Sequence, residues 1–226
     1  MKRIVLLLVL SLLFFSGCRR NVENLPPARF SGKGAMQPGS FTYDIIAESK
    51  DKKIGESILY VRANNNLLEI NESIRNDTAW LDEKTLEPEK VTANYTIRNV
   101  PTQLTAKFLN DLIHISIESH KKIRKFILRK DKNTYPDNAL SYLLSGFDFK
   151  EKNAYIYDYW PYTSLLTLCT IHNLGSEKRN INGKEVTVYH IVLDFGREKR
   201  NLYYSVKAPH ILLEKDVNGL DYILKH

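Results

Sequence analysis

Hydrophobic and polar residues alternate along most of the chain after Phe41. In one such stretch, Val91, Ala93 and Tyr95 alternate with threonine and asparagine. A period of two places successive side chains on opposite faces of an extended strand, so the pattern predicts antiparallel strands with one buried face. We expect strands at approximately 41–49, 54–63, 67–76, 89–99, 103–109, 112–118, 123–130, 154–160, 163–172, 184–196, 200–207 and 217–224.

Asparagine and glycine separate several of these predicted strands. Examples are residues 64–66, Asn110–Asp111, Asn182–Gly183 and Asn218–Gly219. Both residue types tolerate the positive φ angles that tight hairpin turns require. The pattern therefore predicts a mainly β chain built from consecutive hairpins.

One segment, near residues 135–146, has the period of a helix instead. Pro136 and Asp137 are typical of a first helical turn, and Gly146 is a typical helix end. The apolar residues recur at intervals of three and four, which predicts a helix with one face to bury. They are Ala139, Leu140, Leu143, Leu144 and Phe147. A further short turn of helix is expected at 78–83.

The predicted strands 163–172 and 184–196 are apolar on both faces. A strand of this kind is covered on both sides. The simplest arrangement is a strongly curved antiparallel sheet with the helix near 135–146 packed against its concave face. A second protein layer or a bound apolar molecule then covers the other face.

The first residues resemble a bacterial lipoprotein export signal. Lys2 and Arg3 precede an apolar run over residues 4–15, and Ser16-Gly17-Cys18 follows it. The run is too short for a membrane-spanning helix, which needs roughly 20 apolar residues. We expect residues 1–17 to be a signal peptide and the Cys18 thiol to be acylated. An ordinary secretory peptide, in which Cys18 is a neighbouring thiol, is the alternative.

Residues 18–40 are rich in proline and glycine and have no sustained period, which predicts a flexible tether. Residue 19 is arginine, and the enterobacterial sorting rule retains lipoproteins with aspartate there in the inner membrane. The sequence therefore predicts an outer-membrane lipoprotein facing the periplasm. Residues 41–226 are expected to form a single domain.

Charge and cysteine content narrow the function classes. The formal net charge of +7 is spread thinly, and the tightest basic run, residues 121–125, is expected at a solvated hairpin end near anionic lipid headgroups. This pattern does not favour nucleic-acid binding. Once Cys18 is acylated, Cys169 is the only remaining cysteine, so no intrachain disulfide is expected. Cys169 lies in an apolar strand and is predicted to be a small buried hydrophobic residue.

No familiar catalytic motif occurs in the sequence, and the six histidines are scattered, so no enzyme activity, metal or cofactor is predicted. Asp148 and Asp158 lie nearest the helix and an aromatic run, and they are expected to be turn and loop residues.

The aromatic run at residues 155–162 is the densest unusual composition in the chain. On a strand, Tyr155, Tyr157 and Tyr159 share one face, while Asp158 and Trp160 lie on the other. Such rings can stack on sugars, line a lipid-binding groove or belong to an ordinary aromatic core.

Several short motifs together resemble a bacterial family of exported domains of unknown function. They include the strand at Phe41–Ile45 with the turn at Ile54–Ser57, the segment Asp137–Phe149 and the late strand around Tyr203–Ser205 before Pro209. That family is similar in fold to the LolA/LolB lipoprotein carriers. The resemblance implies a curled half-barrel with a helix in its mouth, and it implies no catalytic residues.

Three functional hypotheses follow. The first is a lipoprotein, attached to the membrane through its lipid anchor, that binds a lipid or acyl chain between sheet and helix. The residues expected to line that site are Leu140, Leu144, Leu166, Leu168, Ile191 and Leu193.

The second hypothesis is a glycan-binding protein, or a scaffold for an envelope protein, that uses an aromatic surface. That surface consists of Tyr155, Tyr157, Tyr159 and Trp160. The third, a hydrolase assembled from distant residues, has the least support.

Overall fold

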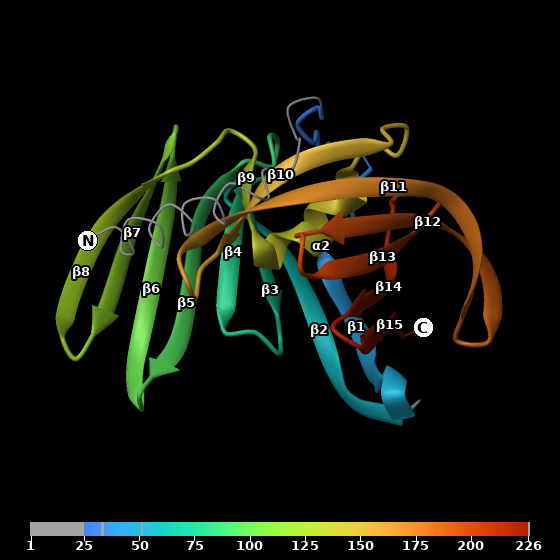
Figure 1. Ribbon diagram of the computed structural model, residues 1–226, viewed down its shortest axis with the longest axis horizontal. Helices are drawn as coiled ribbons and strands as arrows, with labels where there is room; N and C mark the ends of the chain where they lie inside the picture. Colours follow the sequence, from blue (N-terminus) through green and yellow to red (C-terminus); the bar gives the residue numbers. More distant parts are fainter. Residues whose placement is uncertain (1–24, 33, 51, 226) are drawn as a thin grey trace, which may run out of the picture.

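The computed structural model describes residues 25–32, 34–50 and 52–225, and it is mainly β. Fifteen strands form one large mixed sheet that is not closed into a barrel (Figure 1). The strand order is β8-β7-β6-β5-β4-β3-β2-β1-β15-β14-β13-β12-β11-β10-β9. The strands are β1 (Gly39–Ala47), β2 (Lys52–Asn64), β3 (Leu67–Glu72), β4 (Asp77–Asp82), β5 (Pro88–Ile97), β6 (Val100–Leu109), β7 (Leu112–Ser119), β8 (Lys122–Arg129), β9 (Thr134–Pro136), β10 (Asn153–Trp160), β11 (Leu165–Ile181), β12 (Lys184–Asp194), β13 (Lys199–Ser205), β14 (Leu212–Val217) and β15 (Leu220–Leu224).

Consecutive strands pair as antiparallel hairpins on both sides of β1, which pairs with β15 in the middle of the sheet. The one parallel pair among these strands joins β9 to β10. Asn182 and Gly183 have φ angles of 51° and 75°, and Asn218 and Gly219 have 56° and 75°. The prediction of hairpin turns at these positions is therefore confirmed, because residues that tolerate positive φ occupy the turns.

The helical segment is short and lies over one face of the sheet. It consists of a 3-10 turn η2 (Asp137–Ala139), the helix α2 (Leu140–Leu143) and a second 3-10 turn η3 (Leu144–Gly146). Its apolar residues are buried, as the three- and four-residue spacing predicted. The segment starts later than residue 135, because Thr134–Pro136 pairs with β10 as an extended strand. η2 contacts β3, β4 and β10.

Contacts also join strands that are distant in the sheet order. β9, at one end of the sheet, contacts β5, which lies near the other end. Phe108 of β6 meets Tyr159 of β10 edge to face, with ring centroids 5.6 Å apart. In Figure 1 the helical segment lies between β3 and the C-terminal strands β12 and β13. The main hydrophobic core therefore includes side chains from both ends of the sheet.

Part of the predicted tether belongs to the folded domain. The Ala28 amide donates a hydrogen bond to the Tyr155 carbonyl at 2.9 Å, and Phe30 forms a bridge with Phe147. Ala35 and Met36 are buried in the core. The prediction of a free tether up to residue 40 is wrong for this stretch, because its few apolar side chains find partners on β10 and the helical segment. Residues 1–24, with the predicted signal peptide and Cys18, lie outside the described residues.

Residues 78–83 are not helical, and this prediction is wrong. β4 occupies Asp77–Asp82, where buried and half-buried residues alternate and the strand pairs with both β3 and β5. Ladder hydrogen bonds on both edges outweigh the local preference of a short segment. The structure also has β9 and β14, which the sequence analysis omitted, and β11 continues to Ile181.

In the C-terminal half of the sheet, both faces are partly covered by protein side chains, as their apolar composition predicted. A second small core on the outer face joins Ile181, Val188 and Tyr203. The Arg179 guanidinium lies 3.8 Å from the centre of the Tyr203 ring. Among the described residues, no helix is long and apolar enough to cross a membrane.

Candidate functional site

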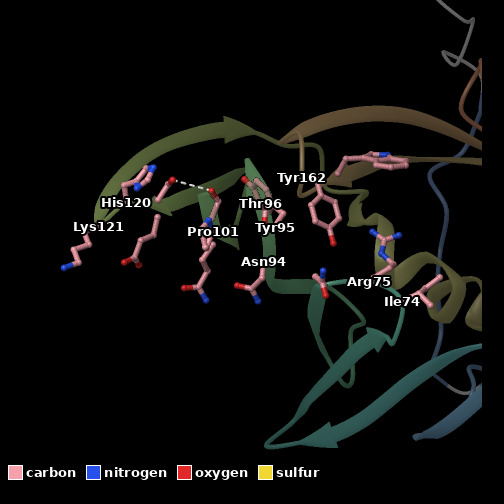
Figure 2. Close-up of a pocket in the computed structure, with 15 residues that line it drawn as sticks. Ile74, Arg75, Asn94, Tyr95, Thr96, Pro101, His120, Lys121 and Tyr162 are labelled. Atoms are coloured by element: carbon pink, nitrogen blue, oxygen red, sulfur yellow. Dashed lines mark hydrogen bonds between the residues drawn. The ribbon is translucent and has the colours of Figure 1, made fainter. Parts of the chain in front are cut away.

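An open groove lies over the ends of β5, β6 and β7, beside the turn that joins β10 to β11. Its volume is about 1040 Å³. Tyr95 and Tyr162 meet edge to face inside it, with ring centroids 5.6 Å apart. Figure 2 shows these two rings close together, with Arg75 and Ile74 near Tyr162. The remaining lining residues are largely polar, so the groove combines aromatic rings with amide, hydroxyl and charged groups. They include Asn76, Asn94, Gln103, Glu118, His120, Lys121 and Trp160.

A smaller cavity of about 260 Å³ adjoins this groove. The two share Ile74, Arg75 and Trp160. The helical segment provides one wall of the cavity, and β3 with the strands β12–β15 provides another. Its apolar lining includes Leu140, Leu193, Leu202, Val217 and Tyr222, and its polar lining includes Glu72, Asp137, Asn138, Ser141, Glu198, Arg200 and Lys215.

A buried ion cluster forms part of the cavity wall. The Asp137 carboxylate accepts hydrogen bonds from Arg75 Nη1 at 2.5 Å and from Arg200 Nη1 at 2.6 Å. Arg75 also donates two hydrogen bonds to Asp77, and Arg200 donates one to Glu198. The β3–β4 turn, which contains Arg75, and the strand β13, which contains Arg200, thereby meet at the first residue of the helical segment. The start of that segment is fixed by charge as well as by packing.

This environment shifts the pKa values of two neighbouring buried carboxyl groups in opposite directions. Burial acts to raise the pKa of Asp137, but the charges of Arg200 and Arg75 hold it below its ordinary value. Burial, together with the nearby charge of Asp137, raises the pKa of Asp158 well above its ordinary value. The same cluster therefore favours the charged form of Asp137 and the neutral form of Asp158.

A second ion pair borders the cavity. Lys215 Nζ donates a hydrogen bond to Glu72 Oε1 at 2.6 Å, and the hydroxyl of Ser57 donates to the same oxygen at 2.9 Å. Lys215 Nζ also lies 4.3 Å from the centre of the Tyr222 ring. Burial acts to raise the pKa of Glu72, but Lys215 lowers it below its ordinary value. The cations of the cavity wall therefore already have anionic partners, which leaves no unpaired charge there for an ionic ligand.

Asn138 differs from the other polar residues of the cavity. Its side chain is only 5% exposed, yet neither its Nδ2 nor its Oδ1 has a hydrogen-bond partner within the described part of the chain. A buried polar group without a partner costs free energy, so native structures rarely retain one without a reason. Asn138 lines the cavity, and its amide carries one donor group and one acceptor group that no described residue satisfies.

The structure does not bring the six predicted apolar site residues to one cavity. Leu140, Leu144, Ile191 and Leu193 are buried in the main core, and only Leu140 and Leu193 among the six line the 260 Å³ cavity. Leu166 and Leu168 are half-buried and line neither the groove nor the cavity. The reason is strand alternation: Cys169 and its partner Ile156 face the helical side of the core, so Leu166 and Leu168 lie on the other face of β11, where Leu166 packs against the part of the core that contains Tyr159. Cys169 is buried, as predicted.

The predicted aromatic surface is correct in its alternation and wrong in its exposure. Tyr155 and Tyr157 share one face, half-buried, with ring centroids 6.1 Å apart. Tyr159 lies on the same face but is fully buried, because Phe108 of β6 covers its ring. Trp160 lies on the other face and lines both the groove and the cavity.

Sequence reasoning missed the ion cluster and Asn138. Asp148 is a turn residue, as expected, because it accepts a hydrogen bond from the Lys150 amide at 3.1 Å. Asp158 is instead a buried strand residue, and the expectation of a loop position is wrong. Its place between Ile156 and Trp160 on the inward face of a strand was a signal of a buried polar group.

One group of carboxylates lies apart from the cavity. Ligand oxygens of Glu48, Asp216 and Asp221 all lie within 4.8 Å of one another. Burial, together with the charge of Glu214 and the other two carboxylates, raises the pKa of Asp221 to about 6. Three acidic side chains near the surface are common without an ion, so the grouping does not define a metal site.

Comparison with family models, curated proteins and solved structures gives no match to this chain, so its function has to be argued from the groove and the cavity themselves.

Proposed function

We propose that this protein is an outer-membrane lipoprotein, anchored through an acylated Cys18, whose β domain binds an amphiphilic envelope molecule with an apolar chain. The proposal includes a half-barrel architecture similar to that of the LolA/LolB carriers. Its support is that β9 contacts β5 from the far end of the sheet and that η2 contacts β3, β4 and β10. A folded-over sheet of this kind provides a natural binding mouth.

The observation on which the ligand proposal rests is the Asn138 amide. It is buried, it has no protein partner in the described part of the chain, and its residue lines a cavity whose other wall combines apolar side chains with paired charged groups. An apolar chain among Leu140, Leu193 and Leu202 would place a polar linkage, such as an ester or an amide, beside this side chain. Each buried methylene contributes about 0.8 kcal/mol, so six contribute roughly 5 kcal/mol before the cost of association. The polar part of the molecule would extend past Trp160 into the groove.

A second candidate, binding of a saccharide, is favoured by the groove alone. Tyr95, Trp160 and Tyr162 line it together with Asn94, Gln103 and Glu118. Aromatic faces beside amide and carboxylate groups are suited to stack on sugar rings and hydrogen-bond their hydroxyls. This candidate uses Trp160 of the predicted aromatic surface and leaves Tyr155 and Tyr157 outside the site.

The decisive experiment replaces Asn138 with leucine. Asn138→Leu removes an unpartnered buried amide, so the ligand-free protein should become more stable, by about 1–3 kcal/mol, while ligand binding is lost. A purely structural asparagine would behave in the opposite way. Native mass spectrometry of the chain purified from its own envelope detects a co-purified ligand. Titration with a fluorescent fatty-acid analogue measures saturable binding.

Asn201→Leu is the matched control. Asn201 Nδ2 donates a hydrogen bond to Asp216 at 2.9 Å, and Asn201 Oδ1 lies 3.0 Å from His190 Nε2. This substitution should therefore lower stability and leave the cavity intact. The amphiphile proposal fails if Asn138→Leu destabilises the protein as Asn201→Leu does, or if it retains saturable probe binding. Retained saccharide binding that Trp160→Ala abolishes would favour the second candidate.

A further inference from the structure

The hairpin formed by β7 and β8 lies at one edge of the sheet, on the opposite side of the molecule from the strands β12–β15 (Figure 1). Residues of those strands line the cavity, and residues of β7 and β8 do not. Residues 121–129 contain five basic side chains and no acidic one. None of these basic side chains forms an ion pair with another described residue. They are Lys121, Lys122, Arg124, Lys125 and Arg129.

Large apolar side chains are interleaved with these charges. Ile123 is 59% exposed, Ile127 is 57% exposed and Phe126 is 38% exposed. Nearly all of β8 is exposed, in contrast to β7, whose Ile113 and Ile115 are buried in the main core. Ile97 and Arg98, at the neighbouring β5–β6 turn, line one surface groove with Lys122 and Arg124 of β8. Ile123 and Ile127 lie on the other face of β8, so exposed apolar side chains and cations are present on both faces of this edge.

Lysine on an edge strand has an ordinary explanation, since charge discourages pairing with the edge of another sheet. That explanation does not extend to Ile123 and Ile127, because exposed β-branched residues promote such pairing. A surface that combines exposed apolar side chains with unpaired cations is instead typical of protein segments that lie in the interface of an anionic bilayer.

We infer that the β7–β8 edge, defined as residues 120–129 with Ile97 and Arg98, docks onto an anionic lipid surface. Its cations would lie at the level of the phosphate groups, while Ile123 and Ile127 enter the region just below. Glu118, paired with Ile123 across the hairpin, is the acidic residue nearest in register to this surface. The inference concerns an interaction surface separate from the cavity, of which only the turn residues His120 and Lys121 also border the groove. It orients the domain on the membrane to which the proposed anchor attaches it.

The test uses the full acylated chain with Ile123→Cys labelled by an environment-sensitive fluorophore, since Cys169 is buried. The protein is placed in vesicles of phosphatidylcholine alone or mixed with phosphatidylglycerol. We expect a blue shift of the label in the anionic vesicles and none in the neutral ones. The matched control is Leu174→Cys, because Leu174 is 63% exposed on β11. Its label should not respond to lipid charge.

Charge removal tests the cations directly. Lys122→Gln, Arg124→Gln and Lys125→Gln together should reduce the ratio of docked to undocked protein by about tenfold or more, since each cation near an anionic surface contributes to binding. The control triple is Lys150→Gln, Lys152→Gln and Lys184→Gln, which removes the same charge from exposed positions elsewhere and should leave the shift unchanged. Both triples should keep the parent melting temperature, because all six side chains are exposed.

Three results would overturn the inference: an equal shift in neutral and anionic vesicles, an equal loss with both triples, or a shift that follows protein density instead of lipid charge. The last result would indicate pairing between two copies. The test separates failure of the proposed anchor from failure of docking. Without the anchor, the protein would not float with vesicles of either composition. Without docking, the protein would float with the vesicles but its label would show no blue shift.

Discussion

Asp137 and Asp158 are neighbouring buried carboxyl groups for which the structure predicts opposite mutational effects. Asp137 accepts a hydrogen bond from each of two arginines, at 2.5 and 2.6 Å. Asp137→Asn leaves Arg75 and Arg200 with one anion fewer in a buried setting. Removing one partner of a buried ion pair costs about 3–5 kcal/mol. For a domain of this size that corresponds to a melting temperature lower by roughly 6–20 °C.

Asp158→Asn should have a different effect. Because the pKa of Asp158 is raised in the folded protein, its contribution to stability is full below its ordinary pKa and is lost as the pH rises through the folded value. An amide is a near match to the protonated carboxyl and does not ionise. The variant should therefore equal the parent near pH 4 and equal or exceed it at pH 8.

The pKa of Asp137 is lowered, so the sign of its contribution is reversed. Its stabilisation is present above the ordinary carboxyl pKa and is lost as the pH falls through the folded value. The cost of Asp137→Asn should accordingly be largest near neutral pH and shrink in acid.

Urea unfolding at several pH values, followed by circular dichroism and tryptophan fluorescence, measures both variants. If Asp158→Asn proves as costly as Asp137→Asn at pH 8, then Asp158 is ionised and paired in the native state, and the inference of opposite pKa shifts is refuted.

Three further predictions concern the anchor, the core and the N-terminal segment. Cys18→Ser should move the protein from the membrane pellet to the soluble fraction, and continued fatty-acid labelling of the pelleted variant would contradict the lipoprotein proposal. Leu143→Ala truncates a fully buried side chain and should cost about 2–5 kcal/mol in urea unfolding, whereas an unchanged midpoint would remove α2 from the core. Gly146→Ala would place a Cβ 2.5 Å from the backbone oxygen of Ser31. The substitution should therefore lower the melting temperature and increase proteolysis near residues 25–32. A protease pattern like that of the parent would argue against this packing.

The sequence by itself determined the local elements. Alternation of apolar and polar residues predicted most of the hairpins, and Asn182–Gly183 occupies a tight turn because its backbone angles suit those residue types. The apolar spacing of Leu140, Leu143 and Leu144 predicted a buried helical face. These features depend on neighbours a few residues apart, so a linear pattern is sufficient to reveal them.

Only the tertiary structure decided which faces meet and which charges pair. Asp137 lies 62 residues from Arg75 and 63 from Arg200, and nothing in the local pattern of any of the three indicates the others. Tyr159 has the alternation of a surface residue and is buried because β6 covers it. Residues 77–82 form a strand because partners on both edges satisfy its backbone. Burial and ion pairing are properties of the space around a side chain, and that space is filled by residues from distant parts of the chain.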